Sequence, residues 1–131
     1  MRKSPQQAAY DWTFKTSKNK GYDTYTHLPM ESDNAAYPFV VCRNSTIAHS
    51  HTKSDLGGTI TQTLDVWGTG AMQVSNIADD LMHSAATVFD AYGYRFSGAL
   101  WHHTCDIETD DMSVPNTTLY HALVSLIFEI M

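Results

Sequence analysis

The stretch Leu119–Met131, with the sequence LYHALVSLIFEIM, is apolar at most positions and contains neither glycine nor proline. Side chains alternate between the two faces of a strand, and here both alternating sets are mainly apolar. A strand of this kind lies in the centre of a sheet or is covered on both sides. We therefore predict a strand over residues 118–131. Two helices do not readily cover both of its faces, so we expect a second subunit to supply part of the cover.

The rest of the chain alternates helical and strand patterns. Ser4 and Pro5 are typical of a helix start, and apolar residues at spacings of three and four predict a later helix. The predicted elements, in chain order, are helix 5–19, strands 22–28, 38–49 and 59–67, helix 74–91, and strands 96–108 and 118–131. The order α-β-β-β-α-β-β predicts an α+β fold, with a largely antiparallel four- to five-stranded sheet and both helices packed on one face.

The length of 131 residues suits a single domain, 1–131. The polar segment 50–58 joins two predicted strands and is too long for a tight turn. We predict that it forms a protruding, mobile hairpin loop. A second loop is predicted over the acidic segment 109–116.

The charge of the chain is unevenly distributed. It has 8 basic and 14 acidic residues, which give a net charge of −6 at pH 7. Residues 1–20 hold five bases and one acid, whereas residues 21–131 hold three bases and thirteen acids. This split predicts oppositely charged surfaces on one subunit. A chain without a broad basic groove is not expected to bind DNA or RNA through phosphates.

Cys42 and Cys105 are too few for a disulfide scaffold. We expect reduced thiols in a cytoplasmic compartment, although the sequence leaves a bridge between the two open. Residues 1–7 lack the apolar run of a signal peptide, and no segment has the ~20 apolar residues of a membrane helix.

Seven histidines raise the alternative of a metal site. His49, His51, His103 and Cys105 offer nitrogen and sulfur ligands that suit zinc, and the corresponding alternative function is a small metal-dependent enzyme. However, the chain has no HExxH or CxxC motif, and its acidic pairs lack the spacing of a calcium loop. We favour surface or interface imidazoles, and we predict no metal, no cofactor and no catalytic residue.

Several short motifs resemble a known family. They are Leu28-Pro29, Tyr37-Pro38-Phe39-Val40-Val41, Thr52-Lys53 in a polar loop, and Gln62-Thr63-Leu64-Asp65-Val66-Trp67-Gly68 before an amphipathic helix. Together they resemble the tail terminator, or tail-to-head joining, proteins of long-tailed bacteriophages. The resemblance is clearest over residues 22–92, and the histidine-rich segment 101–105 lies outside the shared pattern.

The resemblance implies a structural protein and not an enzyme. Such tail-completion proteins form a hexameric ring at the head-proximal end of the tail tube, stop its elongation and join the tail to the head connector. The implied partners are further copies of the chain, the tail tube protein and the head connector or head-closure protein, with neither a membrane nor a specific nucleic acid sequence. The implied location is the virion, at the head–tail interface, after assembly in the cytoplasm of a bacterial host.

The family supplies no residue-level site, so the interaction residues are inferred from the chain itself. We expect the loop at 50–58 to contact a partner through His51, Lys53, Asp55 and Leu56. Trp101 is expected to be an interface anchor, and Leu123 and Ile127 to lie on a partner-covered face of the last strand. Two further alternatives remain open, namely another phage neck protein, such as a head-closure or connector protein, and a ligand-binding α+β domain.

Overall fold

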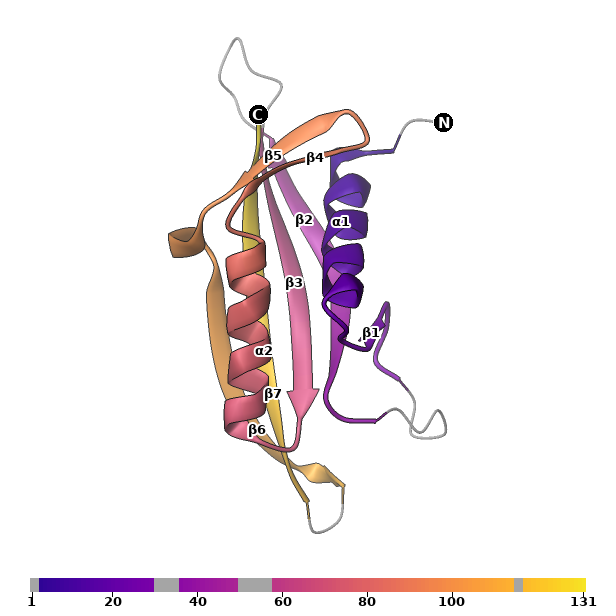
Figure 1. The fold of residues 1–131 in the computed structure, drawn as a ribbon, viewed down its shortest axis with the longest axis vertical. Helices are drawn as coiled ribbons and strands as arrows, with labels where there is room; N and C mark the ends of the chain where they lie inside the picture. Colours follow the sequence, from indigo (N-terminus) through magenta and orange to yellow (C-terminus); the bar gives the residue numbers. More distant parts are fainter. Residues whose placement is uncertain (1–2, 30–35, 50–57, 115–116) are drawn as a thin grey trace.

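The computed structural model describes residues 3–29, 36–49, 58–114 and 117–131 (Figure 1). Its helices are α1 (Pro5–Asn19), α2 (Ala71–Ser84) and a short 3₁₀ helix, η2 (Leu100–His102). Its strands are β1 (Thr24–Tyr25), β2 (Phe39–His49), β3 (Gly58–Gly68), β4 (Val88–Ala91), β5 (Tyr94–Gly98), β6 (Thr104–Val114) and β7 (Thr117–Ile130). The predicted α+β class is confirmed, although the described part of the chain has seven strands instead of four or five.

The last strand, β7, is the centre of the sheet. The strand order is β1-β2-β3-β7-β5-β4, and β6 also pairs with β7. β3 pairs with one side of β7, from Gly58 opposite Ile130 to Gly68 opposite Tyr120, whereas β5 and β6 share its other side. The pairings in the described part are antiparallel, except that of β1 with β2. The last strand is therefore central in the sheet, which is one of the two arrangements predicted from its two apolar faces.

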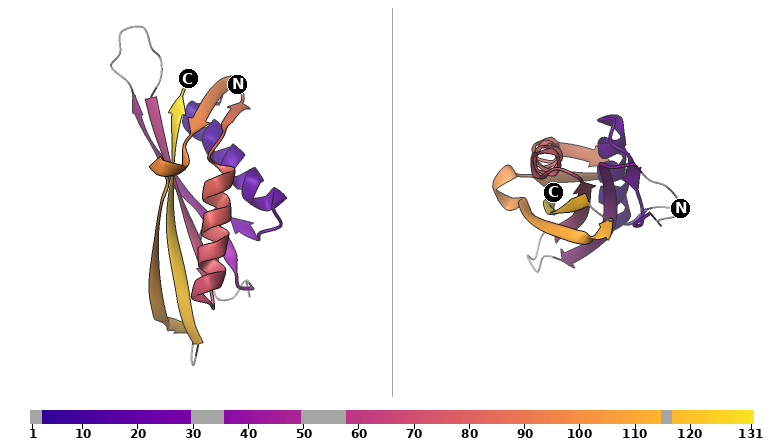
Figure 2. Two further views of the ribbon diagram at one scale, coloured as in Figure 1. Left: turned by 60° about the vertical axis from the view of Figure 1, so that its left-hand side comes forward. Right: turned by 90° about the horizontal axis from the view of Figure 1, so that it is seen from below.

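Both helices pack on one face of the sheet (Figure 2). On that face the alternate residues of β7 are buried, namely Ala122, Val124, Leu126 and Phe128. The helices contribute Ala8, Ala9, Val74, Ala78 and Leu81 to the same core. Trp12 of α1 stacks on Phe89 of β4, with 3.8 Å between ring centroids. Burial stabilises the fold by about 1.5–3 kcal/mol for each large apolar side chain, so this one-sided core holds the helices to the sheet.

The bounds of α1 follow local sequence signals. The Ser4 hydroxyl accepts a hydrogen bond from the backbone N–H of Gln7 at 3.1 Å, and Pro5 occupies the first turn, where its missing N–H costs nothing. The chain turns away at Gly21, whose φ of +91° suits glycine. The predicted helix 5–19 is confirmed.

The second helix ends earlier than predicted, at Ser84, and begins at Ala71. The end of the predicted helix 74–91 is instead the strand β4, which turns into β5 through Tyr92 and Gly93. These two residues have φ values of 49° and 87°, as the tight turn of a β-hairpin requires. Phe89 of β4 is buried in the core. Its position in the sequence continues the helical spacing of apolar residues, which is why the pattern predicts a longer helix although the backbone here is extended.

The strand predicted over 96–108 is divided into β5, η2 and β6. A Cβ at Gly98 would lie 1.9 Å from the carbonyl oxygen of Ala85, so β5 passes the end of α2 where only glycine fits. The chain then leaves the sheet as η2 and returns as β6, which continues to Val114. The acidic loop predicted over 109–116 is therefore wrong through residue 114, because this segment is an edge strand, which tolerates charged residues.

Two other predicted segments have different outcomes. The strand predicted over 22–28 shortens to Thr24–Tyr25, because β1 pairs with β2 at these two positions alone. The loop predicted at 50–58 lies outside the described residues, apart from Gly58, which begins β3.

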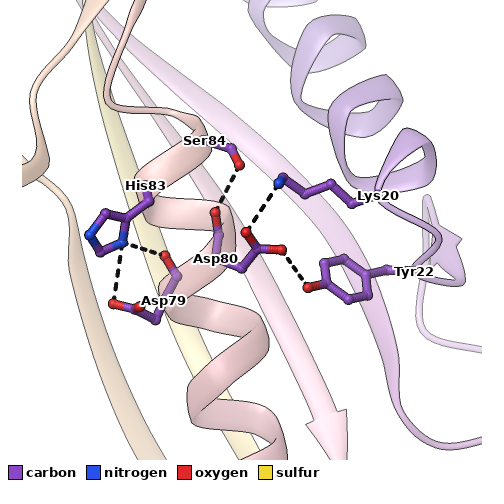
Figure 3. A network of polar contacts seen from close by, with 6 residues as sticks. All are labelled: Lys20, Tyr22, Asp79, Asp80, His83 and Ser84. Atoms are coloured by element: carbon purple, nitrogen blue, oxygen red, sulfur yellow. Dashed lines mark hydrogen bonds and ion pairs between the residues drawn. The ribbon is translucent and has the colours of Figure 1, made fainter.

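A polar network joins the end of α1 to α2 (Figure 3). The Asp80 carboxylate accepts hydrogen bonds from Tyr22 at 2.5 Å and from Lys20 at 3.0 Å. These bonds lower the pKa of Asp80, whereas burial and the bond to Asp80 raise the pKa of Tyr22 to about 12. On the same helix His83 contacts Asp79 instead. The two neighbouring acids therefore have separate structural partners and do not form a carboxylate pair.

Candidate assembly surface

The sheet face opposite the helices carries no helix in the described part of the chain (Figure 2). We call it the open face. Its central residues, at alternate positions of β3 and β7, are partly exposed: Thr59, Thr61, Thr63, Leu123, Ser125 and Ile127. Two predicted interaction residues, Leu123 and Ile127, thus lie where a partner can reach them. That a partner does cover them stays a prediction.

One end of the open face carries a polar and aromatic group that we call the Asp65 cluster: Arg43, Asp65, Trp67 and His121. The Asp65 side chain, in a residue only 7% exposed, bonds with Nε2 of His121 at 2.5 Å and lies 3.3 Å from Nε of Arg43. Trp67 stacks on His121, with ring centroids 4.2 Å apart and an interplanar angle of 1°. His121 and Arg43 satisfy the nearly buried carboxylate of Asp65. The stacking of Trp67 on His121 fixes the orientation of the imidazole that binds this carboxylate.

A β-bulge places Arg43 in this cluster. The register of β2 against β3 shifts within segment 42–45, so Arg43 and Asn44 oppose a single residue. Buried Gln62 holds the bulge, because its Nε2 donates to the Arg43 carbonyl oxygen at 2.7 Å. The sequence did not predict the cluster as a unit. Its members lie on three strands and meet only through the register, which local patterns do not encode.

A shallow depression of about 320 Å³ adjoins the cluster. It is lined by Thr26, His27, Leu28, Val41, Arg43, Asn44, Asp65 and Trp67. Arginine and aromatic residues are enriched in protein–protein interfaces. The composition of this depression therefore suits contact with another protein.

The predicted anchor Trp101 lies on η2 and is 82% exposed. The turn is held by His103, which fills the gap between β5 and β6 along β7. The Ile127 N–H donates to Nδ1 of His103 at 3.0 Å, and Nε2 donates to the Ala85 carbonyl oxygen at 3.1 Å. Burial lowers the pKa of His103, which favours the neutral ring that this bonding needs. An exposed tryptophan is thus presented on a braced turn.

The alternative metal site is not assembled by the described residues. Both ring nitrogens of His103 are engaged by backbone groups, so neither is available to a metal ion. Burial raises the pKa of Cys105, which disfavours the thiolate that zinc binds. Within the described ranges, no three His, Cys, Asp or Glu residues are grouped to hold a metal. The side chains of His49 and His51 lie outside the described residues, as do Lys53, Asp55 and Leu56.

The two cysteines are both free thiols, which answers the open question of a bridge between them. Burial raises the pKa of Cys42 to about 12, so this thiol is a poor nucleophile. Over the part of the chain that the structure describes, no helix has the length and apolar character needed to span a bilayer.

Comparison with known proteins shows a shared fold. No family model matches the chain, and no curated protein matches it. Among solved structures, the fold matches a chain of the virion of a native gene transfer agent (GTA) particle, with a TM-score of 0.57 and 12% sequence identity. The match covers 96% of this chain and 95% of that chain. It therefore extends over the whole architecture and is not confined to one motif.

Proposed function

We propose that the protein is a structural component of a phage-like virion that completes the tail. In this role it forms a ring on the head-proximal end of the tail tube, stops tube elongation and joins the tail to the head connector. The observation that carries the proposal is the fold shared with a gene transfer agent virion chain over nearly the full length of both. The tail-terminator resemblance of the motifs within 28–68 supports the same class of particle.

The proposal describes an assembly protein and not an enzyme. It places the chain in the virion at the head–tail interface, after assembly in the bacterial cytoplasm. A ring requires that each subunit offer two different surfaces, one to each neighbour. The open face, with its Asp65 cluster, and the braced Trp101 provide distinct surfaces for neighbours, for the tube protein and for the connector.

Deleting the gene from the phage or particle genome that encodes it tests this role. Loss of a protein that stops elongation should give tails longer than normal, without attached heads, in electron micrographs. Wild-type protein supplied from a plasmid should restore the normal length. Unjoined tails of normal length would contradict the capping role and favour a head-closure or connector protein. Normal infectious particles would contradict both roles.

Trp101→Ala provides a variant that separates folding from assembly. The side chain is largely exposed, so its loss should leave the unfolding temperature unchanged. Buried tryptophans at interfaces often contribute about 2 kcal/mol or more to binding, so we expect capping of isolated tail tubes to weaken by at least about tenfold. Unchanged capping by the folded variant would remove Trp101 from the contact surface.

A further inference from the structure

Besides the outer edges of the short end strands β1 and β4, two longer edges of the sheet have no partner strand among the described residues. One is the outer edge of β6, which pairs with β7 on its inner side. The other is the outer edge of β2 beyond its bulge, since β1 pairs with β2 at Val40 and Val41. Figure 1 shows β6 and β2 on opposite sides of the sheet. Unpaired edges expose N–H and C=O groups that can bind another strand.

We propose that β6 of one copy pairs antiparallel with β2 of the next copy, so that the sheet continues from subunit to subunit. The inference rests on the proposed ring and names the contact that forms it. The strands β2, β3, β7 and β6 alternate in direction. A neighbour in the same orientation therefore brings its β2 antiparallel to β6, and the alternation is preserved across the contact.

The backbone groups of β6 that this pairing needs point outward. The Val40 N–H donates to the Asp23 carbonyl oxygen at 2.8 Å, on the side of β2 away from β3. In an antiparallel pair, two directly opposed residues point their N–H and C=O groups either both toward each other or both away from each other. Val40 points away from β3, so its partner Val66 points away from β2 and toward Ala122 of β7. Ala122 therefore points away from β6, and its partner Ile107 has its N–H and C=O on the outer edge of β6.

The same rule identifies the outward groups of β2 after the bulge. Ser45 is opposite Gln62, and its carbonyl oxygen accepts a bond from Nε2 of Gln6 at 2.7 Å. Because α1 uses this carbonyl, a neighbouring strand begins to pair further along, at Ile47. Ile47 lies two residues on and has its N–H and C=O on the same outer edge.

The side chains agree with this register. Ile47 is opposite the buried Ile60, and Ile107 is opposite the buried Ala122, so both isoleucines lie on the helix side of the sheet. Directly opposite residues of an antiparallel pair share a face. Pairing Ile47 with Ile107 would therefore bring two apolar side chains together and cover Ile107, which is 45% exposed.

Charge selects β2 of a neighbour over a second β6. The β6 segment contains Asp106, Glu108, Asp110 and Asp111 but no basic residue, whereas β2 contains Arg43 and no acid. A two-fold contact between two β6 strands would bring acids together, and like charges on opposed strands are destabilising. The favoured contact is heterologous, because it joins two different edges. Such a contact forms a closed ring when the rotation from each subunit to the next adds up to a full turn.

A proline at the outer edge tests the contact. Ile107→Pro removes an outward N–H, and proline is tolerated on an edge strand when the N–H faces away from the sheet. Ile107→Thr is the matched control, because it loses the same apolar side chain but keeps the N–H. We expect the proline variant to unfold cooperatively like the wild type but to form no rings on isolated tail tubes, whereas the threonine variant still forms them.

The outcomes separate this contact from the proposed function. A folded Ile107→Pro variant that forms rings as the wild type does would overturn the edge contact alone. If wild-type protein forms no ring on tail tubes or at high concentration, the ring and its contact both fail.

Disulfide trapping keeps the contact testable even if the proline variant does not fold. In a Cys105→Ser background, Ile47→Cys and Ile107→Cys are combined in one chain. Hydrogen-bonded antiparallel pairs have Cα atoms about 5.5 Å apart, within the ~4.4–6.8 Å that a disulfide spans. Oxidised rings should give a ladder of linked subunits on a non-reducing gel, with each single-cysteine variant unlinked. A dimer from Ile107→Cys alone, or rings that do not cross-link, would overturn the proposal.

Discussion

At the residue scale, His103 joins three parts of the fold, because its ring lies between the end of α2, the central strand and the turn that carries Trp101. We predict that His103→Ala lowers the free energy of unfolding by about 2–4 kcal/mol, since each buried polar group left unpaired costs ~1–3 kcal/mol. The groups concerned are the Ile127 N–H and the Ala85 carbonyl. Urea denaturation measures the effect, and exposed His102→Ala serves as the control, with an expected change within about 0.5 kcal/mol. A similarly small change for His103→Ala would contradict its bracing role.

The same residue predicts a dependence of stability on pH. Burial holds the pKa of His103 below its ordinary value in the folded state, whereas the unfolded chain takes up the proton near pH 6.5. Below that pH the unfolded state binds more protons, so the free energy of unfolding falls as the pH falls. Wild-type protein should therefore lose stability between about pH 7 and pH 5 more steeply than His103→Gln, which does not titrate. Parallel stability curves for the two proteins would show that His103 is not held neutral.

At the element scale, the passage of β5 across the end of α2 depends on Gly98. A substitution at Gly98 would place a new Cβ 1.9 Å from the Ala85 carbonyl oxygen. Because this oxygen belongs to the backbone, the clash can be relieved only if β5 or the end of α2 shifts. Gly98→Ala should therefore lower stability by about 1–3 kcal/mol or more, the usual cost of overpacking. Gly70→Ala is the control for space, because its nearest neighbour would be the Gln73 Cβ at 3.7 Å; since Gly70 is the N-cap of α2, this variant should lose only the smaller cost of a poorer cap, about 0.5–1 kcal/mol. Thermal unfolding of the two variants gives the comparison, and equal unfolding temperatures would rule out a tight crossing.

The same crossing marks the limit of what the sequence predicts. The helix 5–19 and the central last strand could be predicted, because Ser4, Pro5 and the alternation of apolar residues are local signals. The end of α2 and the break between β5 and β6 could not, because they depend on contacts of Gly98 and His103 with residues distant in sequence. The Asp65 cluster was hidden for a related reason, since its members become neighbours only when the strands have paired.

At the scale of the whole molecule, the uneven charge of the sequence becomes a spatial arrangement. Two exposed lysines of the first twenty residues, Lys15 and Lys18, lie on α1, which packs beside β2, whereas Lys20 is paired with Asp80 of α2. The exposed acids Asp106 and Glu108 lie on β6, at the other side of the sheet (Figure 1). A head-to-tail contact between copies thus brings the basic flank, at α1 and β2, against the acidic flank, at β6. A two-fold contact would instead place two basic flanks or two acidic flanks together.

This arrangement predicts that self-association weakens with salt. Exposed charges are screened over about 10 Å at 0.1 M salt and over about 3 Å at 1 M, so the attraction between flanks should be largely lost across that range. We expect the dissociation constant between subunits, measured by sedimentation on a concentration series, to rise by about tenfold or more. The free energy of unfolding of the monomer, whose core is apolar, is the control and should not fall in parallel. Association that strengthens with salt would instead indicate that subunits meet through apolar surface, with the open face as the main contact.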